Sequence, residues 1–368
     1  MRRNTYNPQP QPRTGAHGIP PSPPPTLPSA MNYPATLSKL VARADLGEDE
    51  TFELFDELFH GRLTDAQIGA FLAALAAKGE SIAEIAAAAR AMRQAAAKIS
   101  SLRPNTVDTV GTGGDHGITF NISSTTAFVA AGAGAIVAKH GNRSSSGRTG
   151  SADCLEALGL NLACEPEVME EALNEIGICF LFAQTFHKAM RFVGPARKQL
   201  GIRTVFNLLG PLTNPAGART QLIGVYAPEL TEVYAGVFQR LGSTHALVVH
   251  GSDGMDEITV TGPSRCSELK DGRIRTYDID PAPLFGDYAD LSELAGGDAA
   301  ENAAIATGIL TGKIRGAKRD VVLLNAAGTL LAADLVPDLA AGVGKAAESI
   351  DSGAAYEKLR RLVEISRS

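Results

Sequence analysis

Short apolar runs recur along the chain from about residue 105 onward, and helical or glycine-bearing segments separate most of them. The runs are TVDTV, AIVAK, CFLF, LIGVY, ALVVH and VVLLN. Strands that are apolar throughout are typical of a parallel sheet whose two faces are covered by helices. The alternation therefore predicts an α/β fold with a central, mostly parallel sheet in which these six runs are strands.

A helical region precedes this sheet. Between residues 36 and 101, apolar side chains recur at helical spacing, as from Ile68 to Leu75. The segments TDAQ at 64–67 and SIAE at 81–84 have the pattern of a capping box, so each predicts the start of a helix.

The length of 368 residues favours two domains over one. We expect a small all-helical domain over 35–104, completed by a polar, arginine-bearing insertion at about 187–218. The large α/β domain then comprises 105–186 and 219–368. Ten of the 20 prolines lie within residues 1–34, which predicts a disordered Pro-rich extension there, or a start codon that is really Met31.

Composition narrows the classes of function. Apolar residues make up 44% of the chain and charged residues 20%, as in a soluble globular protein. No run reaches the ~18 apolar residues of a membrane helix, so no membrane partner is expected. The net charge of −6 argues against a nucleic-acid partner. Four scattered cysteines are typical of a reducing compartment, which favours a cytoplasmic location.

Two glycine-rich turns lie within residues 107–151. They are GTGGDHG at 111–117 and KHGNRSSSG at 139–147, and each follows an apolar run. Glycine lets main-chain N–H groups approach a ligand closely, and a following helix adds the positive end of its dipole. Two such turns side by side predict a ligand with two clusters of phosphate oxygens.

Two common nucleotide sites do not fit these turns. A dinucleotide site needs an acidic residue at the end of the second strand, where Lys139 and His140 stand instead. A Walker loop needs a lysine that GNRSSSGRT lacks. Further along, Asp256 and Glu257 follow the run ALVV, where paired carboxylates can hold Mg²⁺ on its way to a diphosphate.

Several motifs in one order carry a resemblance to a known family. GTGGD, NIS, KHGNR, TGSADCLEALG, FLFAQTFHKAM, ARKQLGIRT, FNLLGPLTNPA and DG-DE together resemble anthranilate phosphoribosyltransferase, from about residue 36 to the C-terminus. The resemblance implies a small helical domain joined to a large α/β domain, and a homodimer paired through the helical part. It also implies transfer of phosphoribose from phosphoribosyl pyrophosphate (PRPP) to the amine of anthranilate in tryptophan biosynthesis, with Mg²⁺, two ions by expectation.

The resemblance also implies roles for individual residues. The implied PRPP-binding residues are Gly111, Gly114, Asp115, Thr119, Asn121, Ile122, Ser123, Ser124, Lys139, His140, Gly141, Asn142, Arg143, Ser144, Ser145, Ser146, Gly147 and Ser151. The implied anthranilate-binding residues are Gly111, His140, Asn142, His187, Arg197, Gly210 and Pro211. Ser123, Asp256 and Glu257 would hold the metal. We expect the pyrophosphate of PRPP at the first turn and its phosphoribose at the second.

Two residues are predicted to act in catalysis. Arg197 can pair with the anthranilate carboxylate through two parallel hydrogen bonds and so fix the ring. An aniline nitrogen attacks without prior deprotonation, so positioning carries much of the rate. His140 is then either a proton acceptor or a wall of the pocket.

Two alternative functions stay open. A pyrimidine nucleoside phosphorylase shares this architecture, but it would not need the Asp256–Glu257 pair or the Arg197 and Asn142 contacts. A non-enzymatic, nucleic-acid-binding relative of the fold should have a basic surface and a degraded acidic pair. This chain is acidic and keeps the pair.

Overall fold

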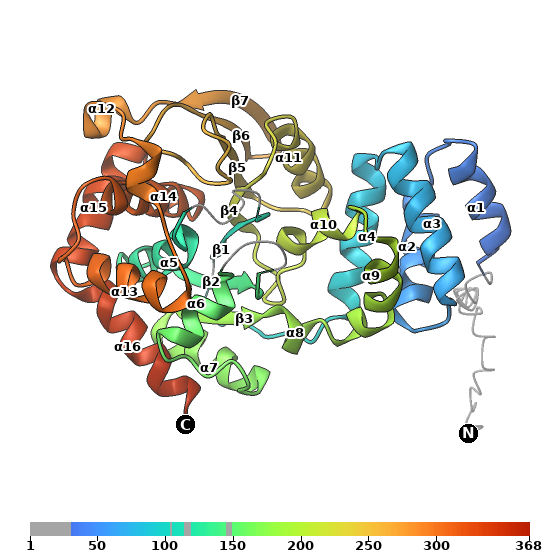
Figure 1. Cartoon of the computed structure of the whole chain (residues 1–368), viewed down its shortest axis with the longest axis horizontal. Helices are drawn as coiled ribbons and strands as arrows, with labels where there is room; N and C mark the ends of the chain where they lie inside the picture. Colours follow the sequence, from blue (N-terminus) through green and yellow to red (C-terminus); the bar gives the residue numbers. More distant parts are fainter. Residues whose placement is uncertain (1–30, 104, 114–118, 145–148) are drawn as a thin grey trace, which may run out of the picture.

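A seven-stranded sheet lies at the centre of the molecule, in the computed structural model that describes residues 31–103, 105–113, 119–144 and 149–368 (Figure 1). The strand order is β3-β2-β1-β4-β5-β6-β7, and β1 to β5 run parallel. The strands are β1 (Thr106–Gly111), β2 (Ile136–Gly141), β3 (Ile178–Phe182), β4 (Thr220–Gly224), β5 (His245–Gly251), β6 (Ser264–Lys270) and β7 (Arg273–Ile279). The predicted α/β class with a mostly parallel sheet is confirmed.

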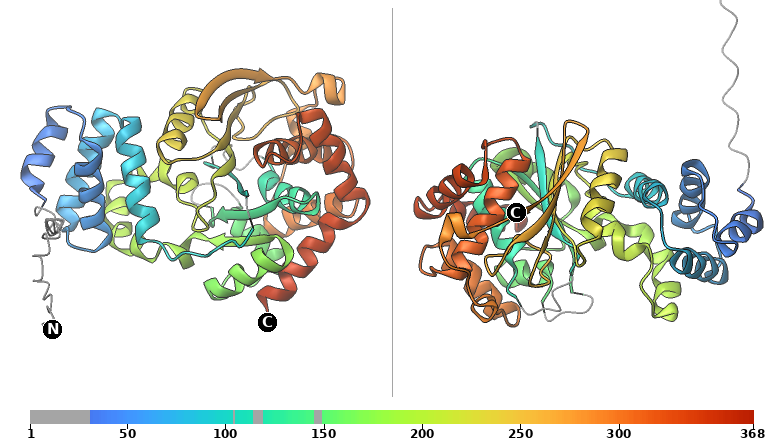
Figure 2. Two further views of the ribbon diagram at one scale, coloured as in Figure 1. Left: turned by 180° about the vertical axis from the view of Figure 1, so that it is seen from behind. Right: turned by 90° about the horizontal axis from the view of Figure 1, so that it is seen from above.

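One face of the sheet is covered by α5, α6 and α7 and by four helices from the C-terminal third of the chain (Figure 2). These helices are α5 (Ile122–Gly132), α6 (Ser151–Ala157), α7 (Pro166–Ile176), α13 (Ala299–Leu310), α14 (Ala317–Ala332), α15 (Leu339–Asp351) and α16 (Ala354–Ser366). Strand side chains alternate between the two faces. Leu247 and Val249 of β5 therefore belong to the core on this side, whereas Ala246 and Val248 belong to the core on the other.

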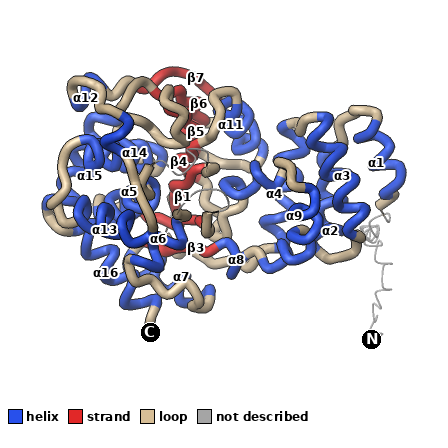
Figure 3. The backbone as a smooth tube through the Cα atoms, viewed as in Figure 1, coloured by secondary structure: helices blue, strands red, loops and turns tan. Residues whose placement is uncertain are grey.

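The opposite face packs against α11 (Leu230–Arg240), which also contacts α4 of an N-terminal helical bundle. The bundle comprises α1 (Tyr33–Val41), α2 (Glu48–Phe59), α3 (Asp65–Lys78) and α4 (Ile82–Ala95). From the middle of the chain, α9 (Gly194–Leu200) packs against α3 and α10 (Phe206–Leu209) against α4. Figure 3 shows this helical part beside the sheet domain. The boundaries that we drew between the two domains stay a prediction.

Helix starts follow the capping signals of the sequence. Thr64 and Gln67 form the predicted capping box of α3, and Ser81 and Glu84 form that of α4. Helix α1 begins at Tyr33, although residues 33 and 34 were assigned to the disordered extension. The Asn32 side chain accepts from the main chain of Ala35, and Pro34 stands in the first turn, where its missing N–H costs nothing.

The prediction that VVLLN is a strand is wrong. These residues lie within the 16-residue helix α14, and all five are buried. Helix α14 packs against the sheet, against α5, which also lies on the sheet, and against α15, so it is apolar on most sides. A short apolar run cannot distinguish such a buried helix from a buried strand.

The hairpin of β6 and β7 was missed. Both strands are antiparallel additions to the sheet edge. Asp271 and Gly272 form the two-residue turn, with φ of 50° and 71°. An Asp-Gly pair between strands is the usual signal for such a turn.

Short elements complete the chain. They are the helices α8 (Ala183–Phe186) and α12 (Ala282–Phe285) and the 3₁₀ turns η1 (Lys188–Phe192), η2 (Gly210–Leu212) and η3 (Leu291–Leu294). Among the described residues, no helix combines the length and apolarity that crossing a membrane requires.

Candidate active site

A pocket of about 390 Å³ opens at the carboxyl ends of the parallel strands. It is here that the turns after β1 and β2, the start of α5, the loop after β5 and the segment from α9 to η2 meet. The lining residues are 110–113, 119–123, 139–144, 149–151, Ala183, Arg197, Phe206, Asn207, Gly210, Pro211 and 255–257. Ligand sites of open parallel sheets lie at this edge.

Most of the predicted site residues lie together in this pocket. They are Gly111, Thr119, Asn121, Ile122, Ser123, Lys139, His140, Gly141, Asn142, Arg143, Ser144, Ser151, Arg197, Gly210, Pro211, Asp256 and Glu257. Ser124 and His187 are buried and do not line it. Gly114, Asp115, Ser145, Ser146 and Gly147 lie outside the described residues.

Asp256 and Glu257 accept hydrogen bonds from the first glycine turn and from the first turn of α5. Oδ2 of Asp256 accepts from the main-chain N–H of Gly113 at 2.7 Å, and Oε1 of Glu257 accepts from that of Ser123 at 3.1 Å. A Cβ at Gly111 would stand 2.2 Å from Oδ2 of Asp256, so only glycine permits this approach. The loop after β5 is thus fitted against the first glycine turn.

The donor set at this point suits a hard cation. Two carboxylates and the Ser123 hydroxyl offer oxygen ligands, which Mg²⁺ prefers. Among the described residues, no group of three or more His, Cys, Asp or Glu side chains could hold a metal. The residues present therefore fit an ion that takes the rest of its ligands from substrate phosphates and water.

Lys139 lies on the floor of the pocket and is 2% exposed. Its Nζ donates to the Thr109 carbonyl at 2.7 Å and to Oγ of Ser123 at 3.2 Å. Burial lowers the pKa of Lys139, and the charges of Asp108 and Glu257 oppose that shift. Its ammonium is therefore directed toward the start of α5, where phosphate oxygens are expected.

His140 and His187 form a buried pair at the other end of the pocket. Nδ1 of His140 lies 3.2 Å from the Gly210 carbonyl. A carbonyl only accepts, so Nδ1 carries the proton and Nε2 is the lone-pair acceptor. Nε2 has no hydrogen-bond partner among the described residues. Burial, and then the neighbouring His187, lower the pKa of His140 to about 3, so the ring stays neutral at neutral pH.

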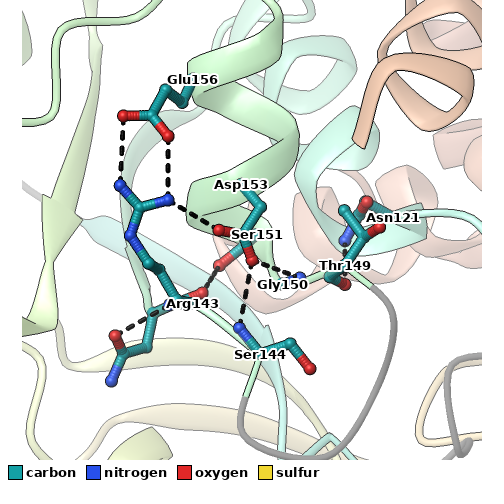
Figure 4. Close-up of polar contacts among 9 residues, drawn as sticks. Asn121, Arg143, Ser144, Thr149, Gly150, Ser151, Asp153 and Glu156 are labelled. Carbon is teal, nitrogen blue, oxygen red and sulfur yellow. Dashed lines mark hydrogen bonds and ion pairs between the residues drawn. The ribbon is translucent and has the colours of Figure 1, made fainter. Parts of the chain in front are cut away.

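The side chain of Arg143 points toward Asp153 and Glu156 (Figure 4). Its guanidinium contacts Asp153 at 2.7 Å and Glu156 at 2.8 Å, both on α6. Asp153 also accepts from the main-chain N–H groups of Ser144 and Gly150. The main chain of Arg143 can therefore contact a phosphate as predicted, whereas its guanidinium is paired with the two carboxylates of α6.

Arg197 lines the pocket from α9 and is half-buried. Its guanidinium lies 5.3 Å from the centre of the Phe206 ring. Burial lowers the pKa of Arg197. No carboxylate pairs with it among the described residues, and Arg197 can therefore receive a carboxylate from a ligand.

Several pocket residues were not predicted. Phe206 and Asn207 stand at the beginning of the FNLLGPLTNPA motif, and Thr149 and Gly150 stand at the beginning of TGSAD. These motifs were used to recognise the resemblance but not read residue by residue. Met255 carried no signal, because an apolar residue before an acidic pair is common in any loop.

Two family models match the chain. The model described as the glycosyl transferase family, a/b domain, matches residues 103–356. The model described as the glycosyl transferase family, helical bundle domain, matches residues 34–96. Together they span both the bundle and the sheet domain.

Curated relatives and solved structures agree with this match. Anthranilate phosphoribosyltransferase from Desulfosudis oleivorans is 56% identical over 336 residues, which cover 91% of this chain and 99% of the relative. The crystal structure of the enzyme of that name from Thermus thermophilus has a TM-score of 0.86 at 44% identity, covering 90% of this chain and 99% of that one. The Saccharomyces cerevisiae enzyme in complex with PRPP and Mg has a TM-score of 0.83 at 28% identity, covering 92% and 99%. This chain therefore belongs to the anthranilate phosphoribosyltransferase family.

Proposed function

We propose that this chain transfers the phosphoribosyl group of PRPP to the amine of anthranilate and releases pyrophosphate. This is the reaction of the family to which the chain belongs. The observation that carries the proposal most directly is the contact between the adjacent Asp256 and Glu257 and the main chain at Gly113 and Ser123. It brings an acidic pair against a glycine turn and a helix start in one pocket, as a metal-bound diphosphate requires.

In this proposal the pyrophosphate of PRPP lies at the first turn, near Gly111, Asn121 and Ser123. Main-chain N–H groups at the start of α5 and the positive end of its dipole stabilise the charge of the leaving group. Asp256, Glu257 and Ser123 would hold Mg²⁺. When bound there, Mg²⁺ neutralises pyrophosphate so that it leaves as a weaker base. The PRPP and Mg complex of the Saccharomyces cerevisiae relative supports PRPP and Mg²⁺ as ligands of this enzyme.

The phosphoribose then extends toward the second turn. Gly141, Asn142, Ser144 and Ser151 contribute main-chain and hydroxyl donors to it, while the Lys139 ammonium, which donates to Ser123, contributes a positive charge on the side of α5. A Cβ at Gly141 would stand 2.2 Å from Oγ of Ser151, so glycine is needed for the turn to close on α6. On the resemblance alone, we include Gly114 and Asp115 of the first turn in the pyrophosphate half, and Ser145, Ser146 and Gly147 of the second turn in the phosphoribose half.

Anthranilate binds on the side of α9 and η2. Arg197 pairs with its carboxylate, and Asn142, Gly210 and Pro211 bound the ring. The complex of the Saccharomyces cerevisiae relative with 4-fluoroanthranilate supports an aromatic acid as the second substrate. His140 forms part of the wall at this end as a neutral ring, and the proton that the amine loses once the new C–N bond has formed passes to solvent. His187 supports the His140 ring from behind.

Two finer assignments belong to the same proposal. The site would take two Mg²⁺ ions, and the chain would pair through its helical domain. Large apolar side chains at the surface of the helical part support pairing there, since Val41 is 70% exposed and Ile202 is 54% exposed. Light scattering in solution tests the pairing, and calorimetric titration with Mg²⁺ in the presence of PRPP tests the number of ions.

The reaction itself is tested by anthranilate fluorescence. Protein mixed with PRPP, Mg²⁺ and anthranilate should quench that fluorescence and release pyrophosphate in equal amounts. Omission of PRPP, or addition of EDTA, should stop both signals. Unchanged fluorescence with PRPP of verified activity would overturn the proposal. Cleavage of a pyrimidine nucleoside by phosphate under the same conditions would instead support the phosphorylase alternative.

A further inference from the structure

Asp108 of β1 carries a carboxylate that is entirely buried below the pocket. Its exposed fraction is 0%, and it stands three residues before Gly111 in the chain. A buried carboxylate costs free energy unless hydrogen bonds satisfy it. Burial raises the pKa of Asp108 to about 6, and hydrogen bonds from Asn214 and His140 oppose that rise. Asp108 does not line the pocket, so its contacts define what it can do.

Each oxygen of Asp108 holds a different segment. Oδ1 accepts from the main-chain N–H of His140 at 3.1 Å, and Oδ2 accepts from Nδ2 of Asn214 at 2.7 Å. Asn214 uses its second N–H on the Ala138 carbonyl at 2.7 Å, and its Oδ1 accepts from the N–H of Ala216. All polar atoms of the Asn214 side chain are thus engaged, and its orientation is fixed.

The segment that Asn214 belongs to forms one wall of the pocket. Gly210 and Pro211 lie on that wall, four and three residues before Asn214. The Gly210 carbonyl accepts from Nδ1 of His140 at 3.2 Å, and the Leu212 carbonyl accepts from Nε of Arg93 on α4 at 2.6 Å. The wall is therefore tied to β2 through His140, to β1 through Asp108 and to the helical bundle through Arg93.

We propose that Asp108 is a positioning residue for the second substrate. Its carboxylate holds the main chain of His140 and the side chain of Asn214 in one fixed relation, and so sets the distance between His140 and the wall of Gly210 and Pro211. This inference rests on the proposed function, because it takes that end of the pocket as the anthranilate end. Asp108 itself does not touch the substrate, and it acts through His140 and Asn214.

Charge alone does not explain the arrangement. An amide at position 108 would keep the shape, but its Nδ2 would face Nδ2 of Asn214. Either Asn214 turns over, which breaks its hydrogen bonds with Ala138 and Ala216, or the amide at position 108 turns over, which sets its Nδ2 against the N–H of His140. Asp108→Asn therefore shifts the wall relative to His140. It breaks no hydrogen bond at the pyrophosphate end, although it removes one of the charges that oppose the lowered pKa of Lys139.

The test compares Asp108→Asn with Asn214→Ala, which removes the amide but keeps the contact between Asp108 and His140. Each should raise the KM for anthranilate by about tenfold, because a small misplacement of a substrate costs rate of this order. The KM for PRPP should stay within about threefold of the wild type.

The control is Glu84→Gln in α4, since Glu84 is another fully buried carboxylate that accepts from two main-chain N–H groups, those of Leu46 and Ser81. It should leave both KM values unchanged. Thermal unfolding is measured for every variant. If Asp108→Asn does not fold, Asn214→Ala, which keeps the contact between Asp108 and His140, should show the same selective rise.

The possible outcomes separate the two proposals. An unchanged anthranilate KM in folded Asp108→Asn, or an equal rise of both KM values, would overturn the positioning role alone. Failure of both Asp108→Asn and Asn214→Ala to fold would also overturn it, because the role would then be structural. A wild-type protein that neither binds nor consumes anthranilate would overturn the proposed function instead.

Discussion

The rings of His140 and His187 lie with their centroids 5.1 Å apart and are inclined by 55°. Both side chains are only 4% exposed. Burial lowers the pKa of His187 to about 4, and burial together with His187 lowers that of His140 to about 3. Protonating either ring places a charge in an apolar site beside a second imidazole, so the pair is neutral wherever the fold is stable.

Stability should therefore fall as the pH drops below 6.5. A lowered pKa in the folded state stabilises the protein above the unfolded pKa of 6.5, and this stabilisation is lost as the pH falls toward the folded values of about 4 and about 3. Between pH 6.5 and 5, each of the two histidines lowers the free energy of unfolding by roughly 2 kcal/mol. The raised pKa of Asp108, about 6, acts in the opposite direction below pH 6 and offsets part of the loss.

Urea unfolding at pH 7 and pH 5 measures this effect. His187→Gln should reduce the loss of unfolding free energy over that interval by roughly 2 kcal/mol. The matched control is His60→Gln, since the His60 side chain is 52% exposed. An equal pH dependence in His187→Gln and wild type would contradict the assignment of a neutral, buried pair.

The acidic pair should be required for turnover but not for folding. Asp256→Asn with Glu257→Gln removes both carboxylates that can hold the metal and keeps their shapes. We expect kcat to fall roughly a hundredfold or more, because the leaving group loses its charge compensation. Binding of Mn²⁺, followed by electron paramagnetic resonance with PRPP present, should weaken in parallel. The control combines Asp278→Asn with Glu229→Gln, since both of these carboxylates are exposed. Retained Mn²⁺ binding in the variant that lacks the Asp256 and Glu257 carboxylates would place the metal elsewhere.

Arg197→Ala should affect one substrate selectively. Removal of the guanidinium leaves the anthranilate carboxylate without its partner, so the KM for anthranilate should rise by about tenfold or more. The KM for PRPP should change by less than about threefold, since the pyrophosphate end has its own donors. Lys198→Ala is the control, because Lys198 is exposed on the same helix and does not line the pocket. A similar rise in both KM values would reject the carboxylate role.

Arg143→Ala should alter the KM for PRPP by less than about threefold, although Arg143 stands in the phosphate-binding motif. The physical reason is that its guanidinium pairs with Asp153 and Glu156 on α6 (Figure 4). Lys139→Met provides the comparison and should raise the PRPP KM far more. A loss with Arg143→Ala as large as with Lys139→Met would mean that the guanidinium turns into the pocket when PRPP binds.

Gly111→Ala should impair the enzyme through the acidic pair. The added Cβ would stand 2.2 Å from Oδ2 of Asp256 and 3.2 Å from its main-chain carbonyl oxygen, so the loop after β5 must move away. We expect the KM for PRPP to rise and kcat to fall by about tenfold or more. Gly344→Ala in α15 has open space around it and should stabilise the helix by roughly 0.5–1 kcal/mol. Unchanged kinetics of Gly111→Ala would contradict the close fit at this turn.

The sequence by itself determined the class of the fold and the ends of several helices, because these depend on local periodicity and capping. Apolar runs defined β1 to β5, and the capping boxes of α3 and α4 form where their residues predict them. Ordered motifs also determined the family, since the chemistry of a phosphoribosyl diphosphate requires particular residues at particular turns. The helix α14 escaped this approach, because burial on most sides removes the polar stripe that identifies a helix.

Only the tertiary structure decided how side chains far apart in the chain share the site. Asp108 and Asn214 lie 106 positions apart and meet because β1 and the segment after η2 converge below the pocket. The pairing of His140 with His187 and the direction of Arg143 toward α6 depend on the same packing. Motifs state which residues are present, whereas charge partners and orientation depend on distances across the fold, which no local pattern contains.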